Sequence, residues 1–130
     1  MLSRFIVLVV IASISVGCGE SGSSGPQIPD GASEAITEVH AAILEASYGG
    51  SPLRSKGDLA QIEQQFPKAV AAIKGGEVEV IWGKTIRDGA GASPQVIAYE
   101  KSAETGEGWA VKEDGTISKI TSADIPSSQK

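Results

Sequence analysis

Residues 108–120 read GWAVKEDGTISKI, and this stretch decides the fold class. Aromatic and β-branched residues on both sides of Asp114-Gly115 predict two antiparallel strands, residues 108–112 and 116–120. We expect a two-residue turn at Asp114-Gly115, because glycine tolerates the positive φ that such a turn requires. The end of the chain is therefore predicted to form a β-hairpin.

Two more strands precede this hairpin. Residues 77–82, EVEVIW, alternate charged and apolar side chains, and residues 95–100, QVIAYE, form the next apolar run. A glycine-containing loop over residues 83–94 connects them. Four strands joined in sequence order predict an antiparallel meander.

Helical periodicity fills the first half of the sequence. Over residues 32–48, Ile36, Val39, His40 and Ile43 recur on one helical face, and Gly49-Gly50 predicts the end of the helix. A second helix is expected from Asp58, with a break at Pro67. A third is expected over residues 68–74. The predicted fold class is α+β, with N-terminal helices packed on one face of a four-stranded antiparallel β-meander.

The first 18 residues, MLSRFIVLVVIASISVGC, are typical of an export signal. Arg4 precedes an apolar run over residues 5–14. That length suits the apolar region of a signal peptide, about 7–15 residues. A transmembrane helix needs about 20 apolar residues. We therefore predict a signal peptide rather than a membrane-spanning helix.

The end of this segment, Val16-Gly17-Cys18, resembles the lipobox of bacterial lipoproteins. The resemblance implies cleavage between Gly17 and Cys18, lipidation of Cys18, and attachment to a membrane through that lipid. Ser15 departs from the leucine that the lipobox usually has at this position. Gly19 stands where lipoproteins retained at the inner membrane carry aspartate, which implies the outer membrane. A type IV prepilin leader is the alternative, but here the apolar run lies wholly before Gly17.

These features divide the chain into four expected parts. Residues 1–17 form the lipoprotein signal peptide, and residues 18–31 form a tether rich in Gly, Ser and Pro. Residues 32–126 form a small α+β domain, and residues 127–130 form a disordered tail.

Composition excludes several classes of function. The 130 residues contain one Cys and one His, so an internal disulfide and a Cys/His metal cluster are both excluded. The formal net charge of −5 disfavours nucleic acid as a partner. We expect no catalytic residue, metal or cofactor, because no nucleophile or carboxylate stands at motif spacing from His40.

Five residues form a candidate binding surface. Trp82, Tyr99 and Trp109 fall on three neighbouring predicted strands, where they build either an aromatic platform or the core of the sheet. Lys84 and Arg87 lie in the 83–94 loop. The expected contact surface is either the sheet face opposite the helices, with Glu77, Glu79 and Ile81, or this loop.

The C-terminal half also resembles a known group of proteins. Trp82-Gly83, residues 98–101 (AYEK), residues 106–108 and Asp114-Gly115-Thr116 form a pattern similar to small uncharacterised bacterial lipoproteins. A helix followed by such a meander also loosely resembles the globular part of pseudopilins. The sequence thus predicts a lipid-anchored cell-envelope protein that acts as a non-catalytic binding or structural module. The alternative is a pseudopilin-like subunit of a secretion or pilus system.

Overall fold

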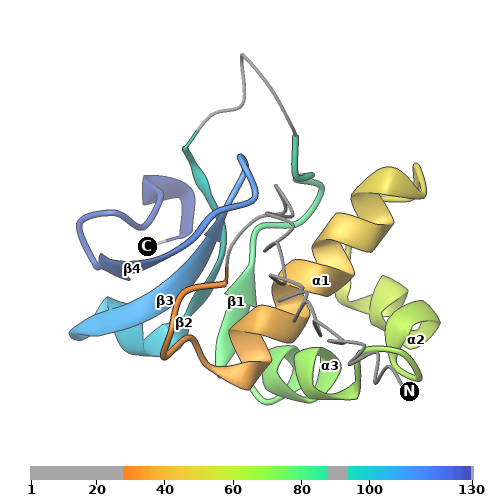
Figure 1. Ribbon diagram of the computed structural model, residues 1–130, viewed down its shortest axis with the longest axis horizontal. Coiled ribbons are helices and arrows are strands. Elements are labelled where there is room, and N and C mark those ends of the chain that lie inside the picture. Colours follow the sequence, from red (N-terminus) through yellow and green to blue (C-terminus); the bar gives the residue numbers. More distant parts are fainter. Residues whose placement is uncertain (1–27, 88–93, 130) are drawn as a thin grey trace, which may run out of the picture.

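The computed structural model describes residues 28–87 and 94–129, and it confirms the α+β class (Figure 1). Helices α1 (Glu34–Tyr48), α2 (Leu59–Ile62) and α3 (Pro67–Lys74) precede the strands. The strands are β1 (Val78–Val80), β2 (Val96–Glu100), β3 (Glu107–Lys112) and β4 (Ile117–Thr121). They form an antiparallel sheet in the order β1-β2-β3-β4, as predicted. The signal peptide, Gly17, Cys18 and the middle of the 83–94 loop lie outside the described residues.

Helix α1 begins and ends where its local sequence directs. The Ile36 backbone N–H donates to Ser33 Oγ at 3.2 Å, which caps the N-terminus. At the other end, the Ser51 N–H donates to the Ala46 carbonyl at 3.1 Å, and Gly50 has a φ of +72°. This hydrogen bond spans the last turn as in a Schellman motif.

The second predicted helix is shorter than expected. It consists of a 3-10 turn, η1 (Lys56–Asp58), followed by the four residues of α2. The Asp58 carboxylate accepts from the backbone N–H groups of Arg54 and Ser55, at 2.8 and 3.1 Å. Pro67 is the first residue of α3, where a missing N–H costs no helical hydrogen bond.

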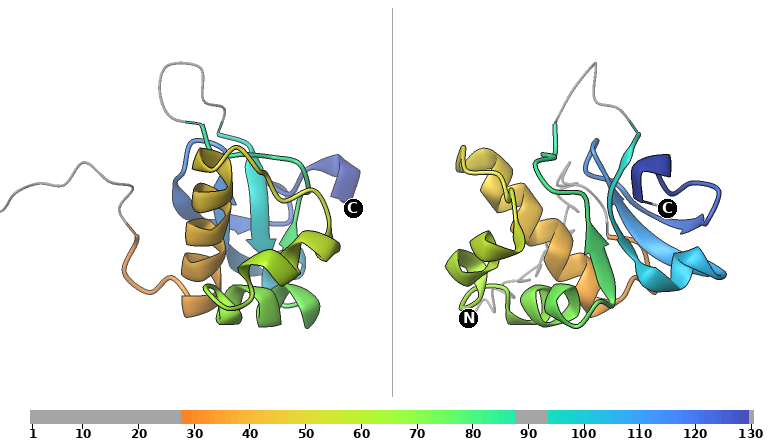
Figure 2. Two further views of the ribbon diagram at one scale, coloured as in Figure 1. Left: turned by 90° about the vertical axis from the view of Figure 1, so that its right-hand side faces the viewer. Right: turned by 180° about the vertical axis from the view of Figure 1, so that it is seen from behind.

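The main core lies between the helices and one face of the sheet. Ile36 and Val39 of α1 pack with Val70 of α3 and with Val78 and Val111 of the sheet, and all five are at most 1% exposed. In Figure 1 and Figure 2 the helices lie on one side of the sheet and the C-terminal segment on the other. Burial of these side chains stabilises the layered arrangement by about 1.5–3 kcal/mol per large apolar residue.

A bulge in β2 determines which of its residues point to each face of the sheet. Val96 pairs with Lys112 but Ala98 pairs with Val111, so one extra residue, Ile97, is inserted. Ile97 and Ala98 both join the main core as a result. Val96 and Tyr99 point to the other face, which is covered as well, so four consecutive β2 residues, 96–99, are buried.

The second face, one of the two expected contact surfaces, is partly covered. Val96, Tyr99, Ala110 and Ile120 form a smaller core with two residues from outside the strands. These two are Ala103 of η2 (Lys101–Glu104) and Ile125 of the C-terminal segment. The predicted disordered tail is corrected. Residues Ser127–Gln129 form a 3-10 helix, η3, in which the Gln129 N–H donates to the Pro126 carbonyl at 2.9 Å.

The turn between β3 and β4 differs from the prediction in length. The Lys112 N–H donates to the Thr116 carbonyl, and the Gly115 N–H donates to the Lys112 carbonyl, both at 2.9 Å. Only Gly115 has a positive φ in this loop, +84°. The loop therefore has three residues, 113–115, in a type I turn followed by a left-handed glycine. The glycine is needed as predicted, but for a different turn.

Replacing Gly115 by valine should lower the free energy of unfolding by about 1–3 kcal/mol, because a β-branched residue resists positive φ. A Cβ at this position would also lie 3.3 Å from Ile86 Cγ2. The measurement is urea denaturation of both proteins. Gly50→Val should be destabilised as well, since φ is also positive there, but by less, because no atom lies within 4 Å of the added Cβ; the difference reports the contact with Ile86. An unchanged denaturation midpoint for Gly115→Val would contradict the turn.

Gly108→Ala should also destabilise the protein, by about 1–3 kcal/mol, because it overpacks the contact between β3 and η2. The added Cβ would lie 2.8 Å from the Ala103 backbone nitrogen and 2.7 Å from Ser102 Oγ. Gly106→Ala is the matched control, since its Cβ would meet nothing closer than the Ser102 carbonyl at 3.9 Å. Equal thermal midpoints for the two alanine variants would show that η2 does not pack against β3 in this way.

Candidate functional site

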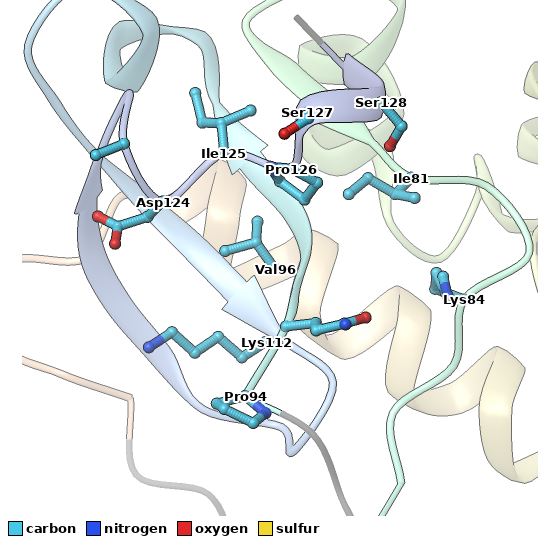
Figure 3. A pocket seen from close by; sticks show the side chains of 12 residues that line it. Ile81, Lys84, Pro94, Val96, Lys112, Asp124, Ile125, Pro126, Ser127 and Ser128 are labelled. Carbon is cyan, nitrogen blue, oxygen red and sulfur yellow. The ribbon is translucent and has the colours of Figure 1, made fainter.

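A groove lies on the sheet face opposite the helices (Figure 3). Its volume is about 530 Å³, within the range of small-ligand and peptide sites. Its walls come from the segment after β1, the start of β2, the end of β3 and the C-terminal segment. The lining residues are Ile81, Lys84, Pro94, Gln95, Val96, Lys112 and residues 123–128.

The floor of the groove is apolar. Val96 and Ile125 are each 5% exposed and belong to the second core, which fixes them in place. Ile81 follows β1, where its N–H donates to the Ile97 carbonyl at 2.8 Å. Pro126 lies beside Ile125 in Figure 3. The groove exists because the C-terminal segment covers only part of this face.

Two lysines flank this floor from opposite sides. Lys84 reaches the groove from the segment after β1, and Lys112 from the end of β3 (Figure 3). Asp124 is the third charged residue of the lining. Its carboxylate accepts from the Thr121 N–H at 3.0 Å and so closes the turn after β4.

The two lysines differ from most cations of the described residues. Within residues 28–87 and 94–129, no carboxylate oxygen lies within 4 Å of either ammonium group. The pKa of Asp114 is lowered: burial raises it, but the hydrogen bonds from Thr116 and the nearby charge of Lys112 together lower it by more. Five other cations pair with carboxylates: Lys68, Lys74, Arg87, Lys101 and Lys119.

The three aromatic residues do not form one platform. Trp82 and Trp109 are half-buried and pack against the main core, on the helix side of the sheet. Tyr99 is 1% exposed and lies in the second core, on the other side. Burial, together with the charges of Glu104 and Glu79, raises the pKa of Tyr99. The core interpretation therefore applies to Tyr99.

The remaining candidates from the sequence are separated as well. Arg87 is exposed, with its Nε 3.5 Å from Glu113 Oε1, and it does not line the groove. Lys119 Nζ lies 5.6 Å from the centroid of the Trp109 ring, so a cation covers that indole. Of the five predicted residues, only Lys84 lines the groove.

Sequence reasoning missed the C-terminal wall of the groove. Residues 127–130 were expected to be disordered, yet Ser127 and Ser128 line it. The signal in the sequence is Ile125-Pro126, an apolar pair isolated among polar residues. Lys112 and Gln95 were also not singled out, because they reach the site only through the pairing of β2 with β3.

His40 is held by a structural hydrogen bond. It is 5% exposed, and its Nε2 lies 2.9 Å from the Gly115 carbonyl oxygen. Since a carbonyl only accepts, Nε2 carries the proton and donates it. Burial lowers the pKa of His40, and the bond to Gly115 opposes this in part. The imidazole thus ties α1 to the loop between β3 and β4.

No family model, curated protein or solved structure matches the chain. Among residues 28–87 and 94–129, no three His, Cys, Asp or Glu side chains gather in a way that could hold a metal ion. None of the helices formed by these residues has the length and apolar character needed to cross a bilayer.

The protein should lose stability on acidification through His40. The folded state holds the pKa of His40 below its ordinary value of about 6.5, so the unfolded state binds the proton first. The free energy of unfolding should therefore fall as pH drops through about 6.5 and level off below the folded pKa. Urea denaturation of wild type and His40→Gln between about pH 8 and 5 measures this.

The difference between the two proteins isolates His40 from the carboxylates that both share. Wild type should lose stability relative to His40→Gln over that interval. A difference that stays constant with pH would contradict the buried, neutral imidazole.

Proposed function

We propose that the chain is a lipid-anchored cell-envelope protein whose folded part is a non-catalytic binding or structural module. The observation that carries this proposal is the position of the only cysteine. Cys18 directly follows Gly17 at the end of an apolar run of signal-peptide length. A thiol at that point can accept a diacylglycerol group and become the first residue of the mature chain.

The start of the folded domain supports an anchor that is separate from it. Ser33 caps α1, and just before it the Ala32 N–H donates to the Pro29 carbonyl at 3.2 Å in a turn. Among the residues that the structure describes from Ile28 onward, the first fully buried one is Ile36. Helix α1 is thus not a continuation of the apolar run. This favours a lipoprotein over the pseudopilin alternative, which expects an apolar helix retained at the mature N-terminus.

A binding role is supported by the contrast between His40, whose side chain makes a structural hydrogen bond, and the two lysines that line the groove. The imidazole of His40 is occupied by the Gly115 carbonyl and holds the fold together. The groove, in contrast, combines an apolar floor with two lysines that lack an ion pair within the described residues. The proposed partners are a membrane, through a lipid on Cys18, and a second envelope protein. Gly19 favours the outer membrane, and the net charge of −5 disfavours nucleic acid.

Replacing Cys18 by alanine should abolish incorporation of radiolabelled palmitate and leave the chain uncleaved or soluble. The alanine has no thiol to acylate. Cell fractionation and the intact mass of the chain report the outcome. Ser13→Ala, in the same apolar run, is the control and should be processed like wild type. A Cys18→Ala chain that is cleaved, acylated and membrane-bound would refute the proposal.

A further inference from the structure

We infer that the groove between Lys84, Lys112 and the C-terminal segment binds an extended acidic peptide of a partner protein, with an apolar residue between acidic ones. This deepens the proposed function, because it rests on the folded part being a binding module. It does not depend on the lipid at Cys18.

Charge is the first argument. The protein is acidic overall, yet the charged residues that line this groove are two lysines and one aspartate. The carboxylate of Asp124 is hydrogen-bonded to the backbone and side chain of Thr121, at 3.0 and 3.4 Å. Neither lysine has an ion pair within residues 28–87 and 94–129. The groove is therefore complementary to negative charge on both sides.

The apolar residues of the groove are the second argument, because an anion alone would not contact them. Val96 and Ile125 form the buried base of the groove, and Ile81, which is half-buried, contributes exposed apolar surface on the side of Lys84 (Figure 3). An inorganic ion would leave the exposed part of Ile81 in water, whereas an apolar side chain of a peptide would cover it. A peptide with an apolar residue between acidic residues would therefore contact both the apolar side chains and the two lysines of the groove.

The rim supplies groups that suit a peptide backbone. The side chains of Gln95, Ser127 and Ser128 line the groove, and none is engaged in a hydrogen bond with another described residue. An amide and two hydroxyl groups can both donate to and accept from peptide groups. A site for phosphate alone would be expected to offer arginine or several backbone N–H groups. The lining residues include no arginine.

The experiment is selection from a fully random peptide-display library on the full-length chain, followed by affinity measurements on the selected peptides. We expect enrichment of sequences in which Asp or Glu flank Leu, Ile or Val. Their affinity should fall about tenfold or more for Lys84→Glu/Lys112→Glu, because attraction becomes repulsion. It should also fall for Ile81→Gln, which keeps both lysines but makes the floor polar.

Arg54→Glu/Lys56→Glu is the matched control, since these cations also lack an ion pair within the described residues and do not line the groove. It makes the same change of net charge and should leave affinity within about twofold. Circular dichroism verifies that every variant is folded.

Three results would overturn the inference. They are selection of no peptides or of non-acidic ones, equal binding to the groove and control variants, and displacement of the peptides by phosphatidylglycerol vesicles or by inorganic phosphate. Failure of lipidation at Cys18 would leave peptide binding intact, and failure of peptide binding would leave lipidation intact. The two proposals are therefore tested separately.

Discussion

Burial of the apolar face of α1 is the constraint on which the rest of the fold depends. Four polar side chains along this helix each hold a different segment against it. Ser33 bonds to Glu100 of β2, and Glu38 accepts from the Ala69 N–H of α3 at 2.6 Å. His40 holds the loop between β3 and β4, and Ser47 accepts from the Ile86 N–H at 3.0 Å. A short helix such as α3 has no capping side chain of its own, so the Glu38 carboxylate supplies one from α1. These hydrogen bonds hold each neighbouring segment at a defined position along α1, in addition to the apolar contacts of the core.

The groove is a consequence of how the sheet is covered on its other side. The bulge at Ile97 turns Val96 and Tyr99 away from the helices, and these side chains need cover of their own. The sequence provides it with η2 and with Ile125, which are too small to cover the whole face. The part left open lies at the start of β2, where Val96 is buried but its neighbours Pro94 and Gln95 are exposed. Incomplete cover of a second core therefore produces an apolar floor at the surface.

Local sequence signals account for most of the fold but not for this groove. The helix ends at Gly49-Gly50 and Gly75-Gly76, the break at Pro67 and the strand order all follow from short-range preferences that the packing does not oppose. The bulge could not be predicted, because QVIAYE fits a regular strand equally well and only pairing with β3 selects the inserted residue. The three-residue loop was missed for a similar reason: Asp-Gly suits a two-residue turn, and the choice depends on the register of Lys112 with Thr116. Groove residues distant in sequence, such as Lys84 and Ser128, are brought to one site only by the pairing of the strands.

The start of the described residues contacts the end of β2, whereas the groove contacts its beginning. The chain enters the domain where Ser33 bonds to Glu100, the last residue of β2, and where a Cβ on Gly31 would lie 4.0 Å from Trp109. The groove lies at the first residues of β2 and the last residue of β3, and on the face away from the helices. A strand of five residues separates these points by about 13 Å at 3.3 Å per residue. The segment from Cys18 to Ile28 can extend at most about 36 Å. In the proposed anchored form, the domain is therefore joined to its tether beside Glu100, about 13 Å along β2 from the groove residue Val96.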